Sequence, residues 1–313
     1  MQNLAFMILA HTDFDQLIRL CEKLVDYGDI YIHVDKRTDD DYVSRLHTYI
    51  STTNVSHVIK LINHRINVTW GGYSQVRAIM TLVEATLYGS KRKYDRVFLI
   101  SGLCYPLLSP EKMRRYCEEN QYQEYLSAIN ITQGDDMRQK RRVILYHFFR
   151  DINLPHKSFI RKGIIGGSRL LLRCLHFRKR PYLIVNNTRW DVYKSAEWVG
   201  LTDVCWRYVY DQLKQYNEIR NYFQTSYAPD ELVIATIVMN SEFGRQAHLS
   251  RSRRLEDLSM LHYLRYTDHI WTYDEKDFEK LINSGKPFVR KLMSGKSEKL
   301  IEMINNLHME WEK

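Results

Sequence analysis

The chain has 313 residues and the composition of an ordinary globular protein, with six prolines and no low-complexity tract. This length allows either one large domain or two small ones. The net charge is +9, yet residues 138–180 hold thirteen Lys and Arg against one acid, so the rest of the chain is nearly neutral. A local basic segment indicates a specific anionic surface or partner and argues against a nucleic-acid-coating protein.

The longest apolar run near the start, residues 4–10, is far too short to span a membrane, and no signal region precedes it. The five cysteines are odd in number and show no paired spacing, which argues against a zinc site or a disulfide framework. We therefore expect a cytoplasmic protein.

The first elements predict a β-α-β unit. Residues 4–10 and 30–34 are continuous apolar runs, as in strands buried on both faces of a parallel sheet, and residues 14–24 have helical spacing between them. The unit places His11 and Asp35 at the carboxyl ends of neighbouring strands, the edge at which open α/β sheets bind ligands.

The next stretch contains two motifs that allow a functional and a structural interpretation. Asp39-Asp40-Asp41 resembles a metal-binding Asp-x-Asp, but it opens a helix at residues 42–49, and we interpret it as a cap. Residues 55–61 predict a third strand. Trp70 and two glycines then open a long helix, where Trp70 either stacks on a flat ligand ring or only packs. No G-x-G-x-x-G or G-K-[ST] motif indicates a dinucleotide enzyme or a P-loop.

The basic segment follows a predicted strand at 96–100, a helix at 110–120 and a strand near 124–128. Its glycines at positions 163, 166 and 167 predict that the segment does not form one long helix. Two interpretations are equally favoured, a solvated basic face and contact with a membrane surface.

The remaining elements are predicted from apolar runs and helical spacing. They are strands at 183–185 and 262–266, and helices after 198–202, at 277–283 and at 297–312.

Tyr227-Ala228-Pro229-Asp230-Glu231-Leu232 precedes the apolar run at residues 233–238. Proline suits the first turn of a helix, and carboxylates are favoured at the positive helix end. We therefore expect Asp230 and Glu231 to lie at the exposed tip of a helix anchored in the core. The alternative is a well-made helix start without a catalytic role.

Several of these stretches, in this order, resemble the core-2/I-branching β-1,6-N-acetylglucosaminyltransferases (glycosyltransferase family 14), which include the peptide O-xylosyltransferases. The stretches are Ile8-Leu9-Ala10-His11, Ile32-His33-Val34-Asp35-Lys36, Trp70-Gly71-Gly72-Tyr73-Ser74-Gln75-Val76, Ser101-Gly102 with Tyr105-Pro106-Leu107, Pro229-Asp230-Glu231 and Phe288-Val289-Arg290-Lys291. The resemblance implies an α/β fold of the GT-A type, with a mixed, mainly parallel central sheet flanked by helices. It implies a single domain over residues 1–313: a nucleotide-binding half at about 1–130, a basic insertion at about 138–180, and an acceptor half at about 181–313.

The resemblance also implies inverting transfer from a UDP-sugar, with N-acetylglucosamine as the expected sugar, without a metal or another cofactor. Glu231 matches the catalytic base of the family. Trp198 and Asp230 are the acceptor residues that we expect. The residues implied to bind the UDP-sugar are Ala10, His11, Asp35 (on the uracil), Trp70 (beside the nucleotide), Arg265 and Lys291 (on the diphosphate).

The chemistry of inversion needs these residue types. A base takes the proton of the acceptor hydroxyl, and fixed cations stabilise the departing diphosphate as Mg²⁺ does elsewhere. Two positions depart from the family pattern: Cys104 replaces the usual Asp, and Ser195-Ala196 replaces a Gly-Ser pair before Trp198.

The expected protein is a bacterial-type relative that builds surface polysaccharide. Its acceptor would be a glycan or a lipid-linked glycan, and residues 138–180 would hold it peripherally on the inner face of the cell membrane. The rival hypothesis is a non-catalytic α/β module that binds a sugar or an anion and docks at a membrane surface.

Overall fold

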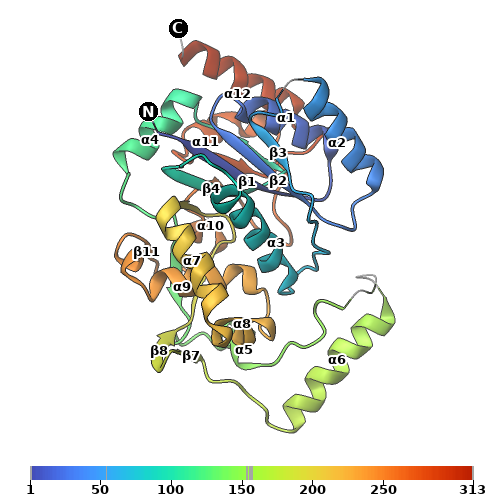
Figure 1. Cartoon of the computed structure of the whole chain (residues 1–313), viewed down its shortest axis with the longest axis vertical. Helices are drawn as coiled ribbons and strands as arrows, with labels where there is room; N and C mark the ends of the chain where they lie inside the picture. Colours follow the sequence, from blue (N-terminus) through green and yellow to red (C-terminus); the bar gives the residue numbers. More distant parts are fainter. Residues whose placement is uncertain (1, 54, 153, 155–157, 312–313) are drawn as a thin grey trace.

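The first apolar run forms β1 (Leu4–Ala10), the middle strand of a five-stranded sheet. β2 (Asp29–Val34) and β4 (Arg96–Ser101) flank it in parallel, and β3 (Ile59–Leu61) adds a fourth parallel strand beyond β2. β10 (Gly200–Thr202) closes the other edge antiparallel to β4. This mixed, mainly parallel sheet flanked by helices is the predicted α/β fold of the GT-A type (Figure 1).

The computed structural model describes residues 2–53, 55–152, 154 and 158–311. Residues 153 and 155–157 of the basic segment, and residue 312 of the predicted terminal helix, lie outside the described residues.

Smaller sheets complete the strand set. They are β11-β6-β9 (His248–Leu249, Ser127–Asn130, Tyr193–Ser195), β12-β13-β5 (His262–Tyr263, Phe288–Arg290, Cys104–Pro106) and the pair β7-β8 (Tyr182–Val185, Thr188–Asp191).

The helices surround these sheets. The α-helices are α1 (Phe14–Leu24), α2 (Asp40–Thr52), α3 (Ser74–Val83), α4 (Pro110–Glu119), α5 (Met137–Ile144), α6 (Phe159–Cys174), α7 (Asp203–Gln215), α8 (Asn217–Gln224), α9 (Val233–Met239), α10 (Leu255–Leu258), α11 (Phe278–Ile282) and α12 (Glu298–Trp311). Single turns are η1 (Glu84–Tyr88), η2 (Pro229–Glu231), η3 (Glu242–Arg245) and η4 (Glu275–Asp277).

Side chains of β1 alternate between two hydrophobic clusters, one on each face of the main sheet. Phe6 and Ile8 belong to the cluster that includes α1, α2, α4 and α12, whereas Ala5 and Met7 belong to the cluster that includes α3, α7 and α9. Figure 1 shows α1, α2 and α12 on one side of the sheet and α3, α7 and α9 on the other. Helices on both faces explain why β1, β2 and β4 are apolar along their whole length.

Asp39 is the N-cap of α2, because its carboxylate accepts a hydrogen bond from the backbone N–H of Asp41 at 3.0 Å. The interpretation of Asp39-Asp40-Asp41 as a helix cap is therefore confirmed.

The prediction that glycines prevent a long helix in the basic segment is wrong, because α6 runs unbroken through Gly163, Gly166 and Gly167. Glycine lowers helix propensity by about 1 kcal/mol, but it keeps the N–H donor that a helix needs. No atom lies within 4 Å of where a Cβ would sit at any of the three positions, so these glycines leave an open flank.

No helix among the described residues combines the length and the apolar character needed to cross a bilayer.

Candidate active site

A cavity of about 1060 Å³ opens at the carboxyl edge of the main sheet. The strand ends meet there, because the backbone N–H of Asp35, after β2, donates to the carbonyl of Ala10, the last residue of β1, at 2.9 Å. The predicted residues that line the cavity are Ala10, His11, Asp35, Trp70, Trp198, Asp230 and Glu231. The structure therefore brings together side chains that are up to 221 positions apart in the chain.

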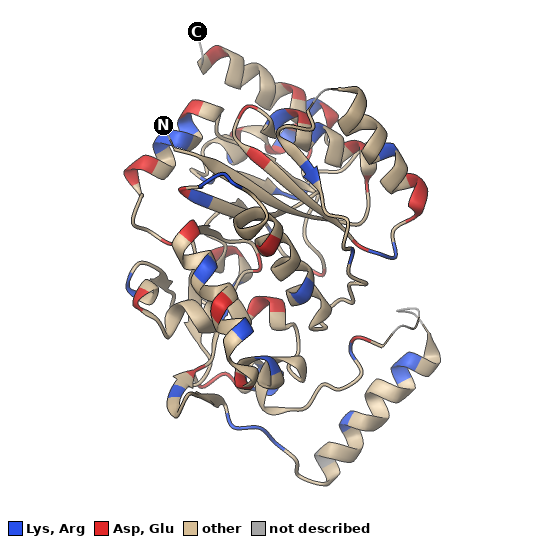
Figure 2. Ribbon diagram, viewed as in Figure 1, with Lys and Arg blue, Asp and Glu red and all other residues tan. Residues whose placement is uncertain are grey.

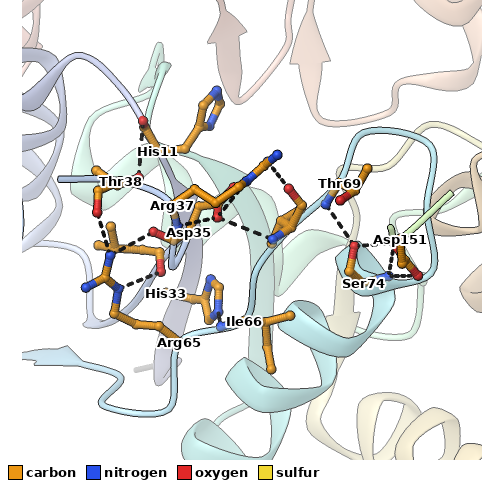
Figure 3. A network of polar contacts seen from close by, with 12 residues as sticks. His11, His33, Asp35, Arg37, Thr38, Arg65, Ile66, Thr69, Ser74 and Asp151 are labelled. Atoms are coloured by element: carbon orange, nitrogen blue, oxygen red, sulfur yellow. Dashed lines mark hydrogen bonds and ion pairs between the residues drawn. The ribbon is translucent and has the colours of Figure 1, made fainter. Parts of the chain in front are cut away.

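Asp35 is held by its neighbours at one end of this cavity (Figure 3). Its carboxylate accepts hydrogen bonds from the backbone N–H of Arg37 at 2.9 Å and of Val68 at 3.3 Å, and pairs with the Arg37 guanidinium at 2.9 Å. Arg65 donates to the carbonyls of Asp35 and Thr38, at 3.0 and 2.8 Å. The Asp35 side chain is buried, whereas the Arg37 side chain is 45% exposed, so the arginine is the partner that can move away.

The loop that carries Trp70 is fixed by the one acid of the basic segment. Asp151 accepts hydrogen bonds from the backbone N–H of Ser74, at 3.1 Å, and from its hydroxyl, at 2.6 Å, at the start of α3 (Figure 3). A Cβ at position 72 would lie 2.0 Å from the Asp151 carboxylate, so a larger residue there would displace Asp151 from Ser74. Trp70 remains 62% exposed on the cavity wall, with the centre of its ring 5.7 Å from the centre of the Tyr227 ring.

The Pro-Asp-Glu stretch does not form an exposed helix tip, and that prediction is wrong. It is the 3-10 turn η2, and α9 begins only at Val233. Asp230 is 8% exposed and the Glu231 side chain 24% exposed. The burial has a physical cause, since the basic segment folds onto this turn, with the backbone N–H of Tyr227 donating to the carbonyl of Arg142 at 2.8 Å.

The Glu231 carboxylate lies between two cations. Arg142, in α5, approaches it to 2.8 Å, and Lys194, in β9, approaches the same oxygen to 3.3 Å. Burial alone would raise the pKa of Glu231, but the two positive charges outweigh it and lower the pKa. Glu231 is therefore a carboxylate at neutral pH.

Two more acids lie beside Glu231 in the cavity wall. Burial, together with the Glu231 charge, raises the pKa of Asp230 to about 7. Burial and the neighbouring Asp230 raise the pKa of Glu197 to about 8. Glu197 also accepts a hydrogen bond from the side-chain amide of Gln75. This group of three acids thus holds one ionised carboxylate and two acids that retain protons near neutral pH.

Arg290 lies in the same cavity wall, with its guanidinium 4.7 Å from the centre of the Trp198 ring. Its Nε and Nη1 atoms are buried and have no hydrogen-bond partner among the described residues. Residue 290 in β13 pairs with Cys104 in β5, the position at which this chain departs from the family pattern. The buried thiol is neutral, since burial raises the pKa of Cys104, and it provides no charge opposite Arg290.

Arg265 and Lys291, the predicted diphosphate ligands, are not among the residues that line the cavity. The Arg265 guanidinium lies 5.6 Å from the centre of the Trp271 ring, and the backbone N–H of Lys291 donates to the carbonyl of Trp271 at 3.3 Å. The loop of Arg265 nevertheless borders the cavity through Leu264 and Tyr266.

Sequence reasoning missed Arg142, Arg150 and Lys194 as site residues and included Arg290 only as a member of the stretch that contains Lys291. The excess charge of residues 138–180 was a signal for the first two, but it did not say which of thirteen cations face the cavity. Lys194 has no sequence signal, because it is a single lysine in a short strand.

No three His, Cys, Asp or Glu side chains within the described residues are grouped so that they could hold a metal ion.

Comparison with known protein families gives one match, to the family described as Core-2/I-Branching enzyme, over residues 4–282. A comparison with curated protein sequences gives no match.

The solved structures to which this chain is similar are distant in sequence. A Bacillus anthracis protein described as a glucose-1-phosphate thymidylyltransferase is 14% identical, with TM-score 0.34, over 79% of this chain and 86% of its own. The WbbM bifunctional glycosyltransferase is 11% identical, with TM-score 0.33, over 94% of this chain and 46% of its own. Mouse xyloside xylosyltransferase 1 is 9% identical, with TM-score 0.35, over 92% of this chain and 97% of its own.

The protonated acids predict that stability falls as pH rises. With pKa values of about 7 for Asp230 and about 8 for Glu197, the folded protein keeps protons that the unfolded chain, titrating near pH 4, has released. The free energy of unfolding should therefore decrease between about pH 5 and 8, by at most about 1.4 kcal/mol per pH unit for each group. Urea unfolding of wild type and Asp230→Asn at several pH values checks this.

The Asp230→Asn variant should show a shallower decrease than the wild type, and Asp268→Asn, in an exposed loop, should follow the wild type. Parallel curves for wild type and Asp230→Asn would show that Asp230 is ionised throughout.

Proposed function

Because the chain belongs to the Core-2/I-branching enzyme family of glycosyltransferases, we propose that it transfers a sugar from a UDP-sugar to a hydroxyl group of a glycan, with inversion at the anomeric carbon. N-acetylglucosamine is the sugar that we propose, and surface polysaccharide synthesis is the process. The observation that carries the proposal is an ionised Glu231 that lines a large cavity beside the nucleotide-binding edge of the sheet.

In the proposed reaction, the acceptor oxygen attacks C1 of the sugar while the bond from C1 to the β-phosphate oxygen breaks. UDP leaves with the electron pair, and Glu231 takes the proton of the acceptor hydroxyl. Arg142 and Lys194 support this role, because they keep Glu231 ionised and hold its carboxylate in one orientation. Trp198 and Asp230 remain the proposed acceptor residues.

We place the uridine at the end of the cavity lined by Ala10, His11, Asp35 and Trp70. Binding of the uracil to Asp35 would displace the half-exposed Arg37 side chain. This placement agrees with the proposed division into a nucleotide-binding half at about 1–130, the basic segment, and an acceptor half at about 181–313.

For the diphosphate we propose Arg290 in addition to Lys291 and Arg265. Arg290 has buried N–H groups without a partner at the cavity wall, and a phosphate oxygen would satisfy them. Fixed guanidinium and ammonium groups would then carry the electrostatic role of a metal, which supports metal-independent transfer.

Replacing Glu231 by Gln keeps the shape of the side chain and removes the base. Turnover of the UDP-sugar with a glycan acceptor should fall by about two to four orders of magnitude. Binding of UDP, measured by calorimetry, should change little. Near-normal kcat would exclude Glu231 as the base, and Glu197→Gln and Asp230→Asn would then identify which neighbour acts.

If wild type turns over no sugar nucleotide from a full panel but binds UDP, the non-catalytic binding module becomes the better explanation.

Metal independence predicts full activity in excess EDTA. Arg290→Ala should weaken UDP binding by about 1.5–3 kcal/mol, the scale of a hydrogen bond to a charged group, and Lys291→Ala is compared in the same titration. The readouts are UDP release with and without EDTA, and calorimetric UDP affinity. Complete loss of activity with EDTA that Mn²⁺ restores would contradict the proposal.

We further propose that α6 holds the protein peripherally on the inner, cytoplasmic face of the cell membrane. Apolar side chains on this helix are exposed, with Phe159 at 88%, Leu170 at 64% and Leu171 at 60%. Figure 2 shows Lys and Arg but no Asp or Glu on α6, which lies at the edge of the molecule. Among the described cations of residues 138–180, Arg142 alone forms an ion pair with a carboxylate. Exposed cations such as Lys162 and Arg178 are therefore available to anionic lipid, whereas Arg161 is buried and Lys179 donates hydrogen bonds within the protein.

Liposome co-sedimentation checks this contact. Each Lys or Arg near an anionic bilayer contributes about 1 kcal/mol, so vesicles of phosphatidylcholine mixed with phosphatidylglycerol should bind the protein at low salt and release it at high salt. The double variant Leu170→Ser/Leu171→Ser should bind more weakly. The matched control Val204→Ser/Leu249→Ser, which replaces exposed residues on α7 and β11, should bind like the wild type. Absence of binding to anionic vesicles at low salt would show that α6 has another role.

A further inference from the structure

Four arginines of the basic segment line the cavity wall without an acidic partner. They are Arg138 and Arg141 of α5, Arg150 of the following loop, and Arg169 of α6. None of the four forms an ion pair with a carboxylate in the described part of the chain, whereas Arg142, beside them, is paired with Glu231. Like charges gathered at one wall repel one another, so a counter-charge from outside the chain would stabilise the arrangement.

Arg150 is the best-defined member of this group. Its guanidinium lies 4.6 Å from the centre of the Tyr227 ring, and its Nε is buried without a hydrogen-bond partner. Burial lowers the pKa of Arg150, and the nearby charges of Arg169 and Arg161 lower it further. The side chain is thus held in place by an aromatic face and still has donors for an anion.

These arginines lie away from His11 and Asp35, which are proposed for the uridine, while Tyr227 contacts both Arg150 and Trp70. His11 and Asp35 follow β1 and β2 at the sheet edge, whereas α5 and α6 lie on the opposite side of the molecule from α1 and α2 (Figure 1). Tyr227, under Arg150, lies two residues before the turn that carries Glu231. The arginines therefore border the part of the cavity in which the acceptor hydroxyl would meet its base.

Arg169 connects this wall with the apolar surface of α6. It lines the cavity, while the next two residues, Leu170 and Leu171, are exposed. A molecule with a lipid chain and a charged headgroup would contact both parts at once.

We propose that Arg141, Arg150 and Arg169 form a second anion site that binds a diphosphate group of the acceptor, separate from the diphosphate site of the donor. Arginine suits this role because its planar guanidinium donates two parallel hydrogen bonds to phosphate oxygens. The acceptor class that follows is a saccharide diphosphate ester of a lipid alcohol. This inference rests on the proposed function, since it takes the cavity to bind both a donor and an acceptor.

The test measures binding of inorganic pyrophosphate to the full chain by calorimetry in the presence of saturating UDP, which fills the donor site. Wild type should bind one pyrophosphate. The double variant Arg150→Gln/Arg169→Gln should bind it at least about tenfold more weakly, because two charged contacts are lost. The matched control Lys140→Gln/Lys162→Gln removes two cations from α5 and α6 that do not line the cavity, and it should bind like the wild type.

UDP affinity without pyrophosphate separates the two proposals. If the arginine double variant keeps wild-type UDP affinity and loses pyrophosphate, the second site is supported. If it loses UDP affinity as well, or if UDP abolishes pyrophosphate binding to the wild type, the arginines belong to the donor site and the inference is overturned. Failure of UDP to bind to wild type at all would contradict the proposed function, while pyrophosphate binding would still report on the arginine site.

A parallel titration with farnesyl diphosphate identifies the source of the diphosphate. Farnesyl diphosphate should bind about tenfold more tightly than pyrophosphate, since burying a few CH₂ groups contributes that much free energy. If Leu170→Ser/Leu171→Ser removes this difference, the result supports a lipid diphosphate. Equal binding of both probes supports the anion site and overturns the assignment to a lipid.

Discussion

The wall of the cavity around Glu231 depends on the ion pairs that the Glu231 carboxylate forms with Arg142 and Lys194. The three residues come from η2, α5 and β9, which are remote in sequence, and the shared charge brings them together. Removing one partner from a buried ionic group leaves an uncompensated charge, at a cost of about 3–5 kcal/mol. The basic segment is therefore part of the cavity wall and not only an addition to the surface.

The same ion pairs affect the protonation states of three neighbouring acids, Glu231, Asp230 and Glu197. Burial is the main reason that the pKa values of Asp230 and Glu197 are raised, and the negative charge of the ionised Glu231 adds to the shift at Asp230, so both acids retain protons near neutral pH. A lowered pKa makes Glu231 a weaker base, but it secures the ionised form over the whole working range of pH. Two protonated acids beside one carboxylate also provide both donors and acceptors for sugar hydroxyl groups.

Features that depend on neighbouring residues could be predicted from the sequence. The apolar runs of β1 and β2, the helix between them and the Asp39 cap follow from local patterns, and so does the meeting of His11 and Asp35 at one sheet edge. The burial of η2 could not be predicted, because the cover over it comes from residues that are far away in the chain.

The cations of the cavity illustrate the same limit in another way. Lys291 belongs to a recognisable motif, yet its neighbour Arg290, the last residue of β13, lines the cavity. Successive residues of an extended chain point to opposite faces, and only the fold shows which face is the cavity. The three glycines of α6 were misleading for a related reason. Propensity describes an average over environments, whereas this helix keeps its backbone hydrogen bonds with an open glycine flank.

The basic segment forms contacts on both sides of the cavity, near the region proposed for the donor and near the region proposed for the acceptor. On one side Asp151 caps α3 and thereby fixes the Trp70 loop, and on the other Arg142 binds Tyr227 and Glu231. Arg150 lies between these two anchors, one residue from Asp151 and over the Tyr227 ring. An anion that binds Arg150 would therefore contact a side chain whose neighbours hold Trp70 at one end of the cavity and Glu231, the proposed base, at the other. The hydrogen bonds of Asp151 and the ion pair of Arg142 hold residues 142–151 at both ends. The same short segment therefore supports the wall proposed for the acceptor and the wall proposed for the nucleotide.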